Sequence, residues 1–295
     1  MSRPAGGVSR RRFLSTLAAA SCLAVVPRSV LGGAGQAPPS ETFAVGVVGC
    51  GGQSGEDVKT YIRHAGGHFR MLACCDIHKG QLARGLKKWG EGCQGYSDFR
   101  RLMDRQDLDV VSVATPPHWH ALIAIAAMES GKDVLCEKPM TKFIAEGRAV
   151  VNAATRYGRV FQIGTGGRWS AWRSSRSRQI HNIMRSGLAK QVNAVYIQRG
   201  GFRVMHYRGM VNPKPRPCPP GLDWDFYCGP APLRPYHPDR FGWHHRFYWD
   251  YEGAGLTDLG AHYMDPIQWI YAKDYTSPVE ANRLANQPMR APWHL

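Results

Sequence analysis

The strongest constraint on this chain is an apolar segment that runs directly into a glycine-rich turn. Residues 45–55 have the sequence VGVVGCGGQSG. Gly49 permits a tight turn, Gly51 lets the backbone approach a pyrophosphate, and a helix that begins there supplies amide donors and the positive end of its dipole. Ser54 stands where the third glycine of the usual G-x-G-x-x-G pattern would be. The segment predicts a Rossmann-type turn that binds a dinucleotide through Gly49, Gly51, Gly52 and Ser54.

An acidic residue follows at the distance that such a turn requires. Asp76 ends the next apolar segment and lies 21 residues beyond Gly55. A carboxylate there accepts hydrogen bonds from the adenosine ribose and repels a 2′-phosphate, which favours NAD over NADP. NADP stays possible because Lys79 and Arg84 are nearby. The alternative is a glycine turn that packs a strand against a helix without any cofactor.

Apolar runs and helical patterns alternate between residues 38 and 163, as is typical of parallel βαβ units. Strands are predicted near 43–49, 70–75, 110–114, 133–136 and 160–163. Helices are predicted near 56–64, 79–89, 98–105, 120–130 and 145–157. From residue 164 the sequence becomes a mixture of Trp, Tyr, Arg, Gly and Pro, with a strand-like segment at 192–198 and a proline-rich one at 213–238. We therefore expect an α/β protein: a doubly wound parallel sheet in residues 38–163, then an α+β domain with a mostly antiparallel sheet in residues 164–295.

The first 37 residues have the order of an export signal. Arg10, Arg11 and Arg12 precede an apolar stretch that ends near Val26, and small residues follow. This pattern predicts a twin-arginine signal and a periplasmic or other extracytoplasmic location. A transmembrane anchor is the alternative, but a helix needs about twenty apolar residues to span a bilayer and this run is shorter. No membrane span is expected once the signal is removed.

Charge and cysteine content narrow the classes of partner. The formal net charge is +16, but the basic residues are scattered rather than collected on one stripe, which argues against a nucleic-acid partner. Cofactor phosphates or an anionic substrate are a simpler reason for part of this charge.

The eight cysteines form no metal-type spacing, so no metal is expected, and a disulfide bond between Cys218 and Cys228 stays open. Cys74 and Cys75, adjacent in a predicted strand, should point to opposite faces as small core residues.

Two more predicted strands end in polar residues, at the sheet edge where ligands of doubly wound folds bind. Residues 110–120 have the sequence VVSVATPPHWH, and residues 131–139 have GKDVLCEKP. These segments resemble the Thr-Pro-x-x-x-His and Glu-Lys-Pro signatures of the Gfo/Idh/MocA oxidoreductases. The resemblance continues through residues 219–225, 229–232, 234–237 and 255–265, which are similar to the exported branch of that family. Together the matching segments cover most of residues 43–280. It implies cofactor contacts by Thr115, Pro116, His120, Glu137 and Lys138.

The same resemblance implies a catalytic set of Lys138, Asp258 and His262, with Lys138 on the reacting hydroxyl. The chemistry of the residues agrees, because oxidation of an alcohol needs a base for the hydroxyl proton and histidine titrates near neutral pH. Asp258 and His262 are four residues apart, so on a single helix they would share one face. The alternatives are that Asp258 only caps a helix, that His262 is a core histidine with its hydrogen bonds satisfied, and that Lys138 is merely exposed.

Aromatic faces and arginine forks suit sugar rings and their hydroxyls or carboxylates. The expected substrate contacts are Arg168, Trp224, Tyr236, Arg240 and Asp265.

The chain departs from the family pattern in two places. Gly166 stands where many members have Gln, and the sequence ends at Leu295, so we expect the second domain to be incomplete.

The sequence therefore predicts an exported NAD(P)-dependent oxidoreductase that acts on a sugar, polyol or derivative. The sequence is also compatible with a homo-oligomer. Because nicotinamide cofactors are not replenished outside the cytoplasm, we expect NAD to stay bound between turnovers. One alternative is a glycosidase or lyase that oxidises its substrate transiently with bound NAD. The other is a non-catalytic protein that binds sugar in a dinucleotide-dependent way.

Overall fold

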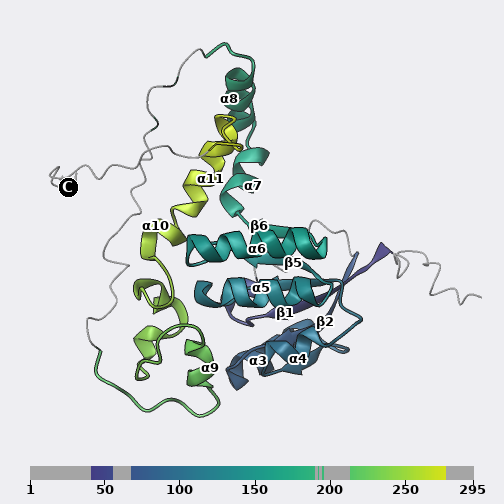
Figure 1. Cartoon of the computed structure of the whole chain (residues 1–295), viewed down its shortest axis with the longest axis vertical. Helices are drawn as coiled ribbons and strands as arrows, with labels where there is room; N and C mark the ends of the chain where they lie inside the picture. The colour runs from purple at the N-terminus through teal and green to yellow at the C-terminus, as the bar shows by residue number, and fades with distance from the viewer. Residues whose placement is uncertain (1–40, 56–67, 190–191, 193–194, 196–212, 277–295) are drawn as a thin grey trace, which may run out of the picture.

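A computed structural model describes residues 41–55, 68–189, 192, 195 and 213–276 (Figure 1). Its first part is a six-stranded sheet in the order β3-β2-β1-β4-β5-β6, in which every neighbouring pair is parallel. The strands are β1 (Phe43–Val48), β2 (Phe69–Cys75), β3 (Gln94–Tyr96), β4 (Val110–Val113), β5 (Asp133–Glu137) and β6 (Phe161–Gly164). The strand order reverses between β1 and β4. In doubly wound sheets ligands bind at the carboxyl ends of the strands next to this reversal.

Helices cover both faces of the sheet. They are α3 (Lys79–Trp89), α4 (Phe99–Met103), α5 (His120–Glu129) and α6 (Ile144–Tyr157). Adjacent strand residues point to opposite faces, so Val48 packs in the core with α4, α5 and α6, whereas Val47 packs with α3. Cys74 and Cys75 divide in the same way, as predicted. Near-continuous burial of β1 fits a central parallel strand with helices on both sides.

The expected doubly wound α/β domain is confirmed. The helix predicted at 79–89 has those bounds, and those at 98–105, 120–130 and 145–157 are shifted by no more than two residues. The sequence prediction missed β3, a three-residue strand without apolar alternation. The helix predicted at 56–64 and the signal in residues 1–37 lie outside the described residues, although residues 52–55 already have helical backbone.

The described residues after 164 form helices that rise away from the sheet and then return to it (Figure 1). They are α7 (Gly166–Arg173), α8 (Ser175–Arg185), α9 (Trp224–Cys228), η5 (Pro238–Arg240), η6 (Gly242–Phe247), α10 (Ala254–Asp258) and α11 (Ala261–Ile270). The strand predicted at 192–198 lies almost entirely outside the described residues, so the antiparallel sheet stays a prediction. Among the helices that are described, none has the length and apolar character of a membrane span.

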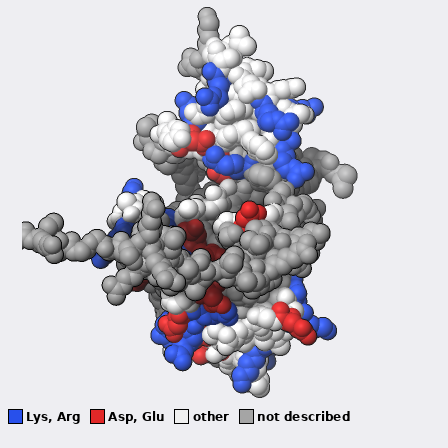
Figure 2. Space-filling model, turned by 90° about the vertical axis from the view of Figure 1, so that its right-hand side faces the viewer, with Lys and Arg blue, Asp and Glu red and all other residues white. Residues whose placement is uncertain are grey.

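The helices α7, α8 and α11 pack against one another. Gly167 permits the approach of α7 to α11, because a Cβ at this position would lie 2.0 Å from the carbonyl oxygen of His262. His181 of α8 stacks on Trp269 of α11 at 4.5 Å. In Figure 2 basic side chains lie at the top, over α8, and also at the opposite end, where acidic side chains lie among them. The outward Arg176, Arg178 and Arg185 belong to α8.

Two side chains join the returning segment to the sheet. His118 Nε2 lies 2.8 Å from the carbonyl oxygen of Tyr227, and Trp119 Nε1 donates to the same oxygen at 3.0 Å. Both belong to η3 (Pro117–Trp119), which follows β4. Burial lowers the pKa of His118 to about 4, so the ring is neutral near pH 7 and Nε2 carries the hydrogen. This junction fixes α9 over the carboxyl end of β4.

Candidate active site

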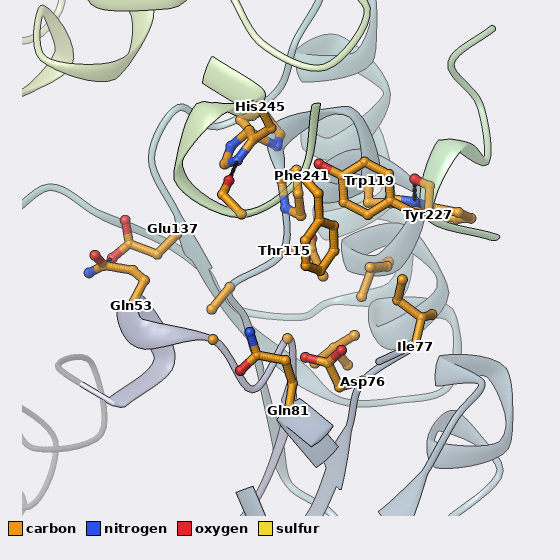
Figure 3. A pocket seen from close by; sticks show the side chains of 18 of the residues that line it. Gln53, Asp76, Ile77, Gln81, Thr115, Trp119, Glu137, Tyr227, Phe241 and His245 are labelled. Atoms are coloured by element: carbon orange, nitrogen blue, oxygen red, sulfur yellow. Dashed lines mark hydrogen bonds between the residues drawn. The ribbon is translucent and has the colours of Figure 1, made fainter. Parts of the chain in front are cut away.

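A cavity of about 550 Å³ lies between the carboxyl edge of the sheet and the segment that returns to it (Figure 3). Its volume is in the usual range for ligand and cofactor sites. The sheet contributes the turn after β1 and the ends of β2, β4 and β5. The returning segment contributes residues of α9, η6 and the loops beside them. From the sheet come Gly49, Gly51, Gly52, Gln53, Asp76, Thr115, Pro116, Glu137 and Lys138, and from the other side Phe226, Tyr227, Phe241, Trp243, His245, Arg246 and Glu252.

The glycine turn has the geometry that the sequence predicts. Gly49 has a φ of 94°, and a Cβ there would lie 2.7 Å from the carbonyl oxygen of Ala114. Gly51 and Gly52 line the cavity, and nothing lies within 4 Å of where their Cβ atoms would be. Ser54 is buried and donates to the carbonyl of Gly51 at 2.8 Å. Ser54 therefore closes the turn, and the two open glycines give a ligand access to the backbone.

Asp76 connects this turn to the end of β2. Its two carboxylate oxygens accept from the backbone N–H groups of Cys50 and His78, each at 2.8 Å. Burial raises the pKa of Asp76, although both hydrogen bonds oppose the shift. Each oxygen keeps lone-pair capacity toward the cavity. The side chain is placed to accept from a ligand while it holds the turn.

His120 lies behind the cavity wall. Its ring nitrogens lie 2.8 Å from the carbonyl oxygens of Thr115 and Pro139, so the ring links the loops after β4 and β5. Burial lowers the pKa of His120 despite the two carbonyls. Thr115 itself faces the cavity, and its buried Oγ1 has no hydrogen-bond partner among the described residues. The resemblance assigned His120 to the cofactor, whereas the structure gives it contacts that position Thr115 and the Lys138–Pro139 segment.

A buried ion cluster joins the end of β5 to the returning segment. Lys138 Nζ donates to Asp258 Oδ1, and Arg246 Nε lies 3.2 Å from Asp258 Oδ2. The side chains of Lys138 and Asp258 are only 9% and 3% exposed. Burial alone would raise the pKa of Asp258, but Lys138 and Arg246 outweigh it and hold the pKa below its usual value. Two cations around one carboxylate leave a positive end at Lys138 and Arg246, both of which line the cavity.

The structure thus brings together Lys138 and Asp258, 120 residues apart in the sequence, but it places His262 differently. Helix α10 ends at Asp258, and α11 begins after the turn at Leu259 and Gly260. Asp258 and His262 therefore lie on successive helices, although Leu259 and Gly260 between them keep right-handed helical dihedral angles. His262 packs against α7 and does not line the cavity described above. Its catalytic role stays a prediction.

The five predicted substrate contacts pair within the protein. Arg168 forks onto Asp265 at 2.7–3.0 Å and reaches Asp274 at 2.7 Å, which joins α7 to α11. Trp224 stacks on Tyr227 at 4.8 Å and packs on Tyr236 edge-on at 5.0 Å. Arg240 covers the ring of Tyr248 at 4.5 Å. None of the five lines the cavity.

Several residues that line the cavity were not predicted from the sequence. Phe226, Phe241, His245, Arg246 and Glu252 come from a segment with no recognisable motif, and they meet the cavity because that segment folds back over the sheet. Phe226 is held by Asp223, whose carboxylate caps α9 by accepting from the Phe226 N–H at 2.9 Å. The run of Arg and aromatic residues around Arg246 was the available signal.

Comparison with known families accounts for both parts of the chain. Residues 43–165 match the oxidoreductase family's NAD-binding Rossmann fold, and residues 174–282 match the C-terminal alpha/beta domain of the same family. An inositol 2-dehydrogenase of Salmonella typhimurium is 32% identical over 124 residues, which are 42% of this chain and 37% of that protein. A glycosyl hydrolase family 109 protein of Solibacter usitatus is 33% identical over 126 residues, which cover 39% and 28% of the two chains. The similarity thus spans only 37% and 28% of the length of these two relatives.

A solved structure shows the same fold over more of the chain. The WlbA dehydrogenase of Bordetella pertussis, determined with NADH and UDP-GlcNAcA, has a TM-score of 0.53 and 18% sequence identity. The superposition covers 78% of this chain and 55% of that one. At this identity the likeness concerns the fold alone.

Proposed function

Because this chain belongs to the Gfo/Idh/MocA oxidoreductase family, we propose that it transfers hydride between a nicotinamide cofactor and a sugar, polyol or related carbohydrate. The observation that carries the proposal is the position of Lys138. Its buried ammonium, paired with Asp258, lines the same cavity as the open glycine turn. One cavity therefore holds a phosphate-binding backbone and a charged group suited to a reacting oxygen.

The cavity residues fit a nicotinamide dinucleotide. The space beside Gly51 and Gly52 would be filled by a Cβ, Asp76 has acceptor capacity for a ribose, and Thr115 Oγ1 is buried without a partner among the described residues. When bound, this cofactor supplies the carbon that accepts or returns a hydride. Gly51, Gly52 and Asp76 would hold its phosphates and ribose.

The chain's own residues act on the alcohol oxygen. A hydroxyl must lose its proton as hydride departs from the same carbon, and negative charge develops on the oxygen. Lys138 Nζ donates a hydrogen bond to that oxygen, gives it a proton when a carbonyl is reduced and takes this proton back when the alcohol is oxidised. Asp258 holds Nζ in place, and Arg246 in turn holds Asp258. The aromatic residues Phe226, Tyr227 and Phe241 exclude water on the side of the cavity that the returning segment forms.

Export and cofactor retention complete the proposal. The twin-arginine pattern at residues 10–12 directs the protein out of the cytoplasm, where free dinucleotide is scarce. The segment over the cavity is fixed by His118 and Trp119, which supports slow dissociation. A retained cofactor that takes hydride from one substrate and returns it, within each cycle, to a second substrate with a carbonyl group would then need no external supply of dinucleotide.

A second candidate is a glycosidase or lyase that works by transient oxidation, which the similarity to a glycosyl hydrolase family 109 protein favours. Oxidation beside a C–H bond makes that hydrogen acidic. A base then removes it, and the glycosidic oxygen takes up a proton and leaves as an alcohol, with a double bond formed in the sugar. In a glycosidase water adds to this double bond, and in both cases hydride returns to the ketone afterwards. The two candidates differ in the oxidation level of the product.

One experiment tests both. Protein from the exported fraction is dialysed, and one part is denatured for cofactor identification by mass spectrometry. A native part is assayed with cyclitols, hexoses, uronic acids and aryl glycosides, each with and without a ketose or aldose as hydride acceptor. We expect nicotinamide dinucleotide in the denatured sample and a product that has lost two hydrogens. A cleaved glycoside of unchanged oxidation level would favour the second candidate. Protein that neither carries nor binds NAD or NADP would exclude both.

The carboxylate of Asp76 predicts the cofactor preference. Asp76→Ala should lower the preference for NAD over NADP by about tenfold, because it removes acceptors for the ribose and the charge that repels a 2′-phosphate. Both dissociation constants are measured by titration of cofactor-free protein. The matched control is Asp109→Ala, since Asp109 also accepts from a backbone amide of β1, that of Ala44 at 2.8 Å, but outside the cavity lining. An unchanged preference in Asp76→Ala would remove Asp76 from the ribose site.

A further inference from the structure

Glu252 is a buried carboxylate in the cavity wall with one oxygen in use. It follows η6, is 2% exposed and lines the cavity. Its Oε2 lies 3.1 Å from His245 Nε2, and the other ring nitrogen of His245 lies 2.5 Å from the carbonyl of Gly242. Figure 3 shows His245 above the cavity, on the side opposite Asp76. Glu252 Oε1 is buried and has no hydrogen-bond partner among the described residues.

Asp239 and His244 form a similar pair in the same segment, but there both carboxylate oxygens have hydrogen-bond partners. Asp239 is also buried next to a histidine, with His244 Nδ1 2.7 Å from one oxygen and Tyr248 Oη 2.5 Å from the other. Both of its oxygens have partners, and Asp239 does not line the cavity. A buried carboxylate oxygen without a donor is costly, because the group has lost its water. Of these two carboxylates, Glu252 is the one that lines the cavity and has an oxygen without a hydrogen-bond partner among the described residues.

The charges around Glu252 select the kind of donor. Lys138 and Arg246 line the same cavity, so positive charge is already supplied and a neutral O–H or N–H group suits the carboxylate better than a further cation. Tyr227 and Phe241 add aromatic faces beside it, and such surfaces pack well on sugar rings.

We propose that Glu252 is a specificity-determining residue whose Oε1 accepts a hydrogen bond from a neutral donor of the bound ligand, with His245 as its positioning residue. The donor is a carbohydrate hydroxyl or the carboxamide N–H of the nicotinamide. This inference rests on the proposed function, since both donors belong to its ligands. It adds to the Lys138 cluster a second polar contact, made by a different segment of the chain.

Calorimetric titrations of Glu252→Gln with NAD, ADP-ribose, myo-inositol and glucose test the proposal, the last two with saturating NAD. Glu252→Gln replaces a charged acceptor with a neutral amide oxygen and should weaken binding by about tenfold, because hydrogen bonds to charged groups are stronger than neutral ones. Weaker NAD with unchanged ADP-ribose identifies the carboxamide as the donor. Weaker sugar or cyclitol with unchanged NAD identifies a hydroxyl. Glu252→Asp, which retracts the carboxylate, replaces Glu252→Gln if the latter does not fold, with the same expected direction.

The control is Asp239→Asn, which should lower the melting temperature without changing any of these affinities. Equal affinities of native protein and Glu252→Gln for every probe that the native protein binds would overturn the proposal and make Glu252 a structural residue. Failure of the native protein to bind NAD would instead contradict the proposed function. The two failures are therefore distinguishable.

Discussion

Lys138→Ala is expected to lower turnover by a factor of about a hundred or more while the affinity for NAD changes little. The lysine lines the cavity, and its ammonium is held by Asp258. A donor on the reacting oxygen matters most when charge develops there, so its loss raises the barrier more than it weakens binding. Single-turnover rates and NAD titrations on the same preparation check both parts.

A second buried lysine provides the control. Lys132 is more deeply buried than Lys138, but its Nζ donates to the carbonyls of Met103 and Ser130 at 2.9 and 3.0 Å, away from the cavity lining. Lys132→Met should reduce stability and leave the turnover of folded protein unchanged. Near-native turnover in Lys138→Ala would show that Lys138 is a structural partner of Asp258. The same assay on His262→Ala decides whether this histidine acts in catalysis or only packs against α7.

The sequence predicted the parts of the site that depend on short local patterns. The glycine turn, Asp76 and Lys138 each follow a strand of the parallel sheet, and such a sheet brings its carboxyl ends to one edge. Knowing the strands was therefore enough to place these residues around one cavity. The contact between Lys138 and Asp258 came from the family resemblance, because no local pattern joins residues 120 positions apart.

The other wall of the cavity depends on how residues 213–252 fold back over the sheet. Arg246 and Glu252 have no spacing that marks them, and their positions follow from the junction of His118 and Trp119 with Tyr227. For Arg168 the predicted chemistry was sound, since an arginine fork does bind a carboxylate. The carboxylate that it binds in the structure is the protein's own Asp265.

Gly49→Ala is expected to destabilise the protein by about 3 kcal/mol and to abolish dinucleotide binding in what remains folded. Gly49 has a φ of 94°, a conformation that side chains with a Cβ rarely adopt. The added methyl group would also lie 2.7 Å from the carbonyl oxygen of Ala114 and 3.0 Å from the amide of Thr115. These are backbone atoms of the loop after β4, so relief requires that β1 and this loop move apart. Denaturant unfolding and NAD titration measure the two effects.

Gly52→Ala separates the cost of folding from the cost of binding. Gly52 lacks a positive φ, and nothing lies within 4 Å of the position of its Cβ, so the free energy of unfolding should stay within about 0.5 kcal/mol of the native value. The methyl group would nevertheless occupy space in the cavity, and NAD affinity should fall. Native stability in Gly49→Ala would mean that the loop after β4 yields to the methyl group. The close approach of these two loops would then not be what shapes the phosphate end of the cavity.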